Sequence, residues 1–147
     1  MSAEFLVLDY ETLSNKPLSA PVISLGAIMG RWEDVNPDDI KGLEKNAFYC
    51  TIKAKRQVEQ YGLKVSADTV RWWSEQGEFA KAMLESTDKV EVEDHCRLFT
   101  EWCIANGITQ KTVTYIRAPH FDYTIMDNIF EKCGFPIPFN TWKIRDL

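Results

Sequence analysis

The fold of this chain is decided by the stretch Phe5-Leu6-Val7-Leu8-Asp9-Tyr10-Glu11-Thr12. Four apolar residues in a row, followed by acidic and polar ones, predict a short strand buried on both faces. Side chains two apart in a strand share a face, so Asp9 and Glu11 should lie close together at its end. Repulsion between two carboxylates beside an apolar core is costly, and a hard divalent cation with carboxylate ligands would relieve it. The competing interpretation is that both acids are solvated at a strand end.

Length and composition narrow the class of protein. The 147 residues, of which 45% are hydrophobic and 27% charged, predict one globular domain with a real core. The net charge of −5 argues against a nonspecific nucleic-acid coat protein, but it permits an enzyme with a local basic patch and bound metal. No apolar run is long enough for a bilayer and no signal pattern opens the chain, so we expect a cytoplasmic protein. The 4 cysteines form no C-x-x-C pair and predict neither a zinc site nor a disulfide framework.

Two further strands should follow the first. Residues 22–29 read as a strand in which Ser24 and Gly26 share a side and leave room for close packing. Residues 47–52 read as a third strand, and the short connections predict an antiparallel meander. The basic run at 53–56 is either a solvated loop or a patch that faces phosphates.

Helices and a later strand occupy the second half of the sequence. Ser66 is the expected N-cap of a helix that contains the adjacent Trp72 and Trp73. Neighbours on a helix point about 100° apart, so one ring could fill the core while the other stacks on a base, or both could be structural. A helix over 91–106 should be stopped by Gly107, and a strand over 112–116 should run parallel to its neighbour after this crossover.

Asp122 is the third acid of interest. It lies in the first turn of a helix expected to begin near residue 120 and to end at Gly134, before a last strand over 141–147. The helix dipole favours an acid in a first turn, so an ordinary structural role is one explanation and an acidic site is the other. The elements together predict an α/β fold, with a mixed sheet of three antiparallel strands and then parallel ones, flanked by helices.

These motifs resemble a known family when they are taken in order. D-x-E-T on the first strand, I-x-L-G-A on the second and F-D at a helix start resemble the DnaQ-like DEDD 3′–5′ exonucleases, which have an RNase H-like fold. The closer resemblance is to the branch of phage T4 exodeoxyribonuclease A and a mycobacterial exoribonuclease. It is carried by the helix that ends in two tryptophans, by Arg117 before the F-D pair, and by a W-x-x-R-D segment at 142–146.

The resemblance implies a nuclease that removes nucleotides from the 3′ end of DNA or RNA with two magnesium or manganese ions. One ion would help to generate the attacking hydroxide and the other would stabilise the leaving 3′ oxygen. The implied metal ligands and catalytic residues are Asp9, Glu11 and Asp122. Contacts with substrate are expected from a second set of residues: Thr12, Leu13, Trp72, Trp73 and Arg117.

The sequence departs from the family pattern in two places. The third motif, a fourth aspartate preceded by a histidine or tyrosine base, has no counterpart, and neither His95 nor His120 stands in the required position. Ala118 and Pro119 replace the glycine usual after the arginine. We therefore expect a single exonuclease-like domain over residues 1–147 that is C-terminally incomplete and poorly active alone. The alternatives are a partner chain that completes the fold, and a catalytically incomplete protein that acts as a binding or assembly module. The sheet face left open would favour a homo-oligomer.

Overall fold

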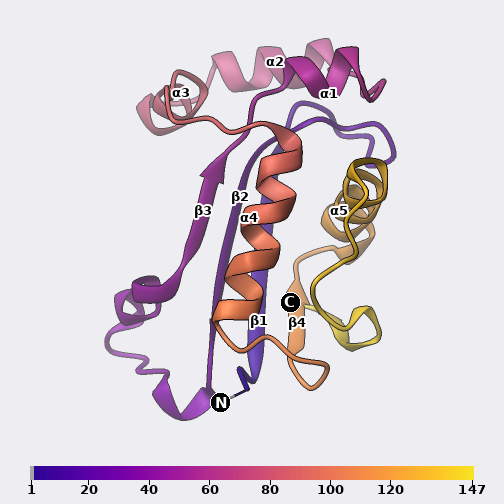
Figure 1. The fold of residues 1–147 in the computed structure, drawn as a ribbon. Coiled ribbons are helices and arrows are strands. Elements are labelled where there is room, and N and C mark those ends of the chain that lie inside the picture. The colour runs from indigo at the N-terminus through magenta and orange to yellow at the C-terminus, as the bar shows by residue number, and fades with distance from the viewer. Residues whose placement is uncertain (1) are drawn as a thin grey trace.

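The computed structural model describes residues 2–147, whose strands form one five-stranded mixed sheet in the order β3-β2-β1-β4-β5 (Figure 1). The strands are β1 (Phe5–Thr12), β2 (Val22–Gly30), β3 (Phe48–Thr51), β4 (Val113–Ile116) and β5 (Ile144–Asp146). β1, β2 and β3 pair antiparallel, whereas β4 lies parallel to β1 and β5 lies parallel to β4. The predicted meander followed by parallel strands is therefore confirmed.

Helices cover one face and one end of the sheet. They are α1 (Lys55–Glu59), α2 (Ala67–Ser74), α3 (Glu78–Leu84), α4 (Val92–Ala105) and α5 (Pro119–Cys133). α4 and α5 pack on one face, while α1, α2 and α3 lie across the end at which β1 finishes (Figure 1). None of the helices described in residues 2–147 is long and apolar enough to cross a membrane.

The helix boundaries follow local chemistry where the sequence supplies it. The Ser66 side chain accepts a hydrogen bond from the Thr69 N–H at 3.4 Å and caps α2, as predicted. Gly134 ends α5 at φ 80°, a left-handed conformation that glycine adopts without a steric penalty. Two helices escaped prediction, α1 because it has five residues and α3 because it contains no buried residue and thus no clear apolar stripe. Residues Thr141–Lys143 form a 3₁₀ turn before β5 instead of the start of a strand.

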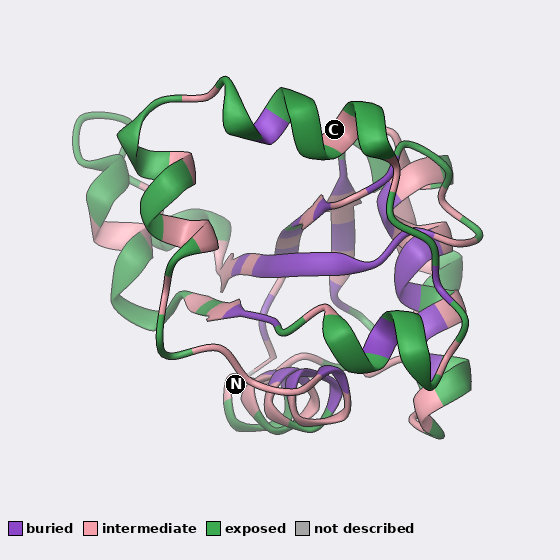
Figure 2. Cartoon of the chain, turned by 90° about the horizontal axis from the view of Figure 1, so that it is seen from above, coloured by how far each residue is buried: buried purple, intermediate pink, exposed green. Residues whose placement is uncertain are grey.

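The core lies between the sheet and the two long helices. Leu6, Leu8 and Tyr10 of β1 are buried against α4 and α5, together with fully buried side chains such as Phe99 and Phe130. Figure 2 shows the buried residues concentrated in the central strands and on the inner sides of these helices. The prediction that β1 is buried on both faces was wrong, because Val7 is half-buried and Asp9 is exposed on the other side. One face of β1 is thus free to carry the two acids.

Candidate active site

The acid pair lies at the mouth of a pocket of about 390 Å³. Asp9 and Glu11 project from the face of β1 opposite the core, where the sheet meets the helices at its end. The pairing of β1 with β2 is irregular between Glu11 and Thr12, a distortion that re-aims side chains at a strand end. The pocket is lined by Asp9, Glu11, Ser24, Gly26, Tyr49, Trp73, Phe79, Ala80 and Met83. It therefore joins a carboxylate rim to a largely apolar interior.

The third acid reaches β1 from the far end of the chain. Pairing of β1 with β4 covers only Phe5 to Val7, so β4 does not extend along the Asp9–Glu11 segment. Asp122, buried in the first turn of α5, fills that place: its Oδ2 accepts a hydrogen bond from the Tyr10 N–H at 3.2 Å. Asp122 is thereby attached to the residue that separates Asp9 from Glu11.

The charges of the three acids influence one another. Burial, the Asp9 side chain and the Glu11 charge together raise the pKa of Asp122 to about 7, and the hydrogen bond from the Tyr10 N–H limits this rise. Burial also raises the pKa of Glu11, with the Asp9 charge as the next cause. Acids whose pKa values are raised by burial and by neighbouring carboxylates often mark a functional site.

The donor set fits a hard dication in its chemistry. All three candidates offer carboxylate oxygens, the ligands that Mg²⁺ and Mn²⁺ prefer. Within residues 2–147, however, no three acidic, histidine or cysteine side chains are gathered tightly enough to form a finished metal-binding cluster. The acids are thus close enough to interact but do not converge on one point.

The residues after the acid pair serve the architecture of the pocket. Thr12 is buried and its Oγ1 donates to the Ser14 carbonyl at 2.8 Å, while the Thr12 carbonyl accepts from Trp73 Nε1 at 2.8 Å. Leu13 joins neighbouring segments through its main chain, donating to Pro21 and accepting from Ser66. The main chain at the end of β1 is therefore held from several sides.

The question of the two tryptophans is resolved by their exposure. Trp73 is 8% exposed and forms part of the pocket wall, whereas Trp72 is 52% exposed. Their rings meet edge to face with centroids 4.9 Å apart. Trp73 therefore has a structural role that also shapes the pocket, and Trp72 offers a free ring beside it.

The approach to Asp122 is a strained turn. Arg117 is exposed in the bend between β4 and α5, and His120 is exposed two residues before Asp122. Ala118, where the family usually has glycine, adopts φ 52° and ψ 68°, a left-handed conformation that costs a residue with a Cβ about 1–2 kcal/mol. Its N–H donates to Asp146 Oδ1 at 3.2 Å, so Asp146 ties β5 to this turn.

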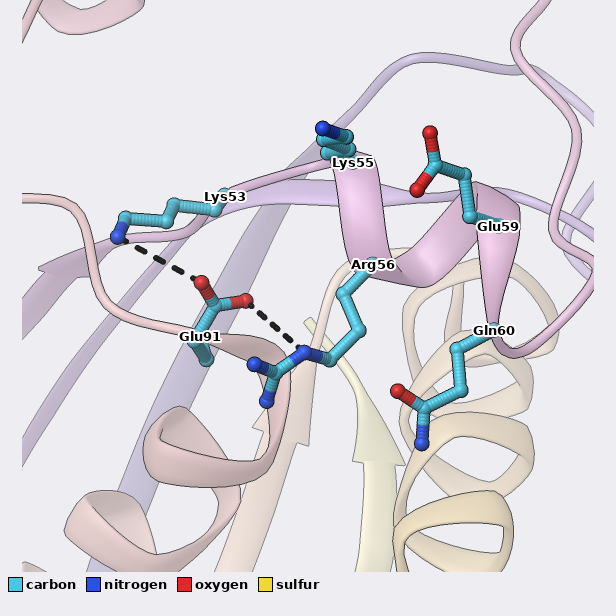
Figure 3. A pocket seen from close by; sticks show the side chains of 6 residues that line it. All are labelled: Lys53, Lys55, Arg56, Glu59, Gln60 and Glu91. Carbon is cyan, nitrogen blue, oxygen red and sulfur yellow. Dashed lines mark ion pairs between the residues drawn. The ribbon is translucent and has the colours of Figure 1, made fainter.

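The basic run is engaged in ion pairs. Lys53 lies 3.5 Å from Glu91, and Arg56 contacts the same glutamate at 3.6 Å (Figure 3). Arg56 also contacts Glu93 at 2.6 Å. Lys53, Arg56 and Glu91 line a separate pocket of about 520 Å³ beside the start of α4, to which Asp9, Glu11 and Asp122 do not contribute. The glutamates pair with Lys53 and Arg56, which argues against a phosphate-facing patch. The run is only partly the predicted loop, because Lys55 and Arg56 begin α1.

Sequence reasoning missed most of the pocket's apolar wall. Tyr49 comes from β3, while Phe79, Ala80 and Met83 come from α3, the helix that was not predicted. The signal present in the sequence was the spacing of four between Phe79 and Met83, which places both on one side of a helix. Ser24 and Gly26 do line the pocket, as the room expected on their side of β2 suggested.

Comparisons with known proteins agree with this architecture. Residues 4–147 match the family described as the 3′-5′ exoribonuclease Rv2179c-like domain. Among solved structures, apo exonuclease I aligns at a TM-score of 0.65 and 16% identity, over 100% of this chain and 29% of that one. The zinc-bound form of the E. coli ExoI–ssDNA complex aligns at 0.66 and 15% identity, over 100% and 28%. E. coli exonuclease I with a dT13 oligonucleotide aligns at 0.64 and 17% identity, again over 100% and 28%.

The family match and the structural matches support different conclusions. A search of curated proteins gives no match. The chain spans less than a third of the length of the exonuclease I chains, and at such low identity the likeness shows a shared fold. The family match covers nearly the whole chain, and it is therefore the finding that identifies the family. The chain belongs to the Rv2179c-like 3′-5′ exoribonuclease domain family.

Proposed function

We propose that this protein is a metal-dependent 3′–5′ exonuclease that removes nucleotides from single-stranded nucleic acid, with Asp9, Glu11 and Asp122 as its metal ligands. The observation that carries the proposal is the attachment of Asp122 to the Tyr10 N–H, between the two acids of β1. Carboxylates that repel one another in a partly buried place are stabilised when a dication binds them. Family membership supports the same activity.

The pocket supports a nucleotide as the ligand. At about 390 Å³ it is at the small end of ligand pockets, which suits a single nucleotide better than a base pair. Tyr49, Trp73 and Phe79 supply aromatic surface, and Phe79 is 97% exposed. Gly26 lies beside the Tyr49 ring, where a Cβ would make only an ordinary van der Waals contact at 3.9 Å. Stacking on such a wall is tolerant of base identity.

The proposed roles follow from this arrangement. Bound dications supply an activated water and stabilise the charge that develops on the leaving 3′ oxygen. Asp9, Glu11 and Asp122 hold the ions, and the Trp73–Thr12 hydrogen bond keeps the end of β1 in place beside them. The aromatic wall orients the terminal nucleotide so that its phosphate faces the carboxylates. The exposed Arg117 is a candidate contact for the phosphate backbone.

The substrate is proposed as RNA first and DNA second. The family is described as exoribonucleases, while two of the similar structures are named as complexes with single-stranded DNA or a dT13 oligonucleotide. A 2′-hydroxyl would be recognised by polar groups of this pocket, whose lining includes Ser24, Tyr49 and the acid pair.

The experiment is the shortening of a 5′-labelled single-stranded 20-mer, as RNA and as DNA, with Mn²⁺, Mg²⁺ or EDTA. We expect a ladder that shortens from the 3′ end with metal and no shortening with EDTA, Asp9→Asn or Glu11→Gln. Glu101→Gln, an exposed acid on α4, is the matched control and should cut at the wild-type rate. Binding of the strand without metal-dependent shortening would contradict the proposal and favour a binding module.

A further inference from the structure

A buried hydrogen bond lies directly beneath the acidic end of β1. Tyr10 stands between Asp9 and Glu11, but its side chain turns to the opposite face and into the core. Its hydroxyl lies 2.8 Å from Nε2 of His95, which is 0% exposed on α4. His95 Nδ1 lies 2.6 Å from the Val92 carbonyl oxygen. Because a carbonyl only accepts, Nδ1 carries the proton, Nε2 accepts and the Tyr10 hydroxyl donates. The contacts thus select one tautomer and one direction for this chain of hydrogen bonds.

The main chain of the same tyrosine holds the third acid. The ladder between β1 and β4 ends at Val7 and Tyr115, so β4 offers no partner to the Tyr10 N–H. Asp122 Oδ2 accepts from that N–H instead. The orientation of the Tyr10 peptide therefore sets where the Asp122 carboxylate lies relative to its two neighbours on β1.

Three elements meet at the histidine. α4 supplies His95, β1 supplies Tyr10, and Phe130 of α5 packs against the imidazole edge to face, with ring centroids 5.7 Å apart. Tyr10 and His95 also pack edge to face, at 5.8 Å. Side chains this tightly enclosed have little freedom to rotate, so the tyrosine ring anchors the peptide to which it belongs.

We propose that His95 is a positioning residue, which acts through Tyr10 to place the Asp122 carboxylate beside Asp9 and Glu11. The proposal rests on the proposed function, because the value of this placement lies in metal binding by the three acids. His95 itself touches neither metal nor substrate. Its contribution is to hold the Tyr10 side chain, and through it the Tyr10 N–H to which the Asp122 carboxylate is hydrogen-bonded.

The first test is hydrogen exchange at the Tyr10 amide in metal-free protein. His95→Leu and Tyr10→Phe each remove the buried hydrogen bond, and Tyr10→Phe keeps the ring, so at least this variant should fold. We expect the Tyr10 amide to exchange about tenfold faster relative to the Val113 amide, which donates to Glu4 in the neighbouring ladder. In His95→Gln the side-chain oxygen can still accept from the tyrosine hydroxyl. The Tyr10 amide of this variant should therefore keep most of its wild-type protection from exchange.

The control separates positioning from ordinary stability. Cys103 is fully buried on α4, eight residues or about two helical turns after His95. Cys103→Ala should therefore lower the melting temperature and leave the Tyr10 to Val113 ratio at its wild-type value. If His95→Leu and Tyr10→Phe also leave that ratio unchanged, the positioning role is wrong.

The second test is the melting-temperature shift produced by Mn²⁺. We expect the apparent Kd for Mn²⁺ to weaken about tenfold in Tyr10→Phe and to stay at the wild-type value in Cys103→Ala. If Mn²⁺ raises the melting temperature of the wild type and of Tyr10→Phe equally, the positioning role of His95 is wrong while the proposed function stands. A wild-type protein that does not respond to Mn²⁺ contradicts the proposed function instead, and the exchange ratio then still decides whether His95 positions this peptide.

Discussion

Replacing Asp122 with asparagine should stabilise the protein when no metal is present. Burial, followed by the side chain of Asp9 and the charge of Glu11, raises the pKa of Asp122 from 3.8 to about 7. Because this pKa is higher in the folded than in the unfolded state, the carboxyl contributes its stability below about pH 4 and loses it as the pH rises through 7. At pH 8 the ionised Asp122 should therefore lower the free energy of unfolding by about 2–4 kcal/mol.

Asparagine has the same shape, and its amide oxygen can still accept from the Tyr10 N–H. We expect Asp122→Asn to raise the unfolding free energy by about 1–3 kcal/mol at pH 8 in EDTA, and by much less at pH 5, where the wild-type carboxyl is mostly protonated. Mn²⁺ at about a thousand times its Kd should reverse the order, because it stabilises the wild type by about 4.1 kcal/mol. Urea unfolding at pH 5 and pH 8, each with EDTA and with Mn²⁺, measures the difference in unfolding free energy between the variant and the wild type under all four conditions.

The matched control is Asp127→Asn, the same substitution at an exposed site on the same helix, which should stay within about 0.5 kcal/mol of the wild type. The reasoning is refuted if Asp122→Asn destabilises the metal-free protein at pH 8. It is also refuted if the variant keeps the full Mn²⁺ response, since Asp122 would then be no ligand.

Three further predictions address the pocket, the core and the strained turn. Phe79→Ala should leave the melting temperature unchanged, since Phe79 is 97% exposed. It should raise the KM for oligonucleotides about 5- to 150-fold, because one stacked base is worth about 1–3 kcal/mol; an unchanged KM rules out stacking there. Burial lowers the pKa of His95 from 6.5 to about 4, so the stability that its neutral form provides is complete above pH 6.5 and is lost as the pH falls towards 4, by on the order of 3 kcal/mol. Urea unfolding should show that the free energy of unfolding falls with pH in the wild type and falls less in His95→Gln. Equal pH dependence in the two proteins would contradict this role of the buried histidine. Ala118→Gly should raise the melting temperature, because it relieves about 1 kcal/mol of left-handed strain at φ 52°; a lower value in calorimetry contradicts the strain.

Much of the fold could be predicted because its signals are local. The apolar run of β1 and the acids at its end predicted a strand with a carboxylate pair, and the strand lies at Phe5–Thr12 as expected. Ser66 and Gly134 marked the ends of helices through capping chemistry that involves only nearby residues. α3 escaped because none of its residues is buried, so no periodic stripe distinguished it from a loop.

The sequence by itself determined which chemistry was available: a carboxylate pair on one strand face, a third acid in a helix's first turn and a fold able to join them. Only the tertiary structure decided how they meet. Asp122 reaches the Tyr10 N–H because the ladder between β1 and β4 stops at Val7, and the positive charge of Lys53 and Arg56 is satisfied because α4 brings Glu91 and Glu93 beside them. Strand and helix signals are set by neighbours in the sequence, whereas these contacts depend on sheet register and helix packing, which many distant residues fix together.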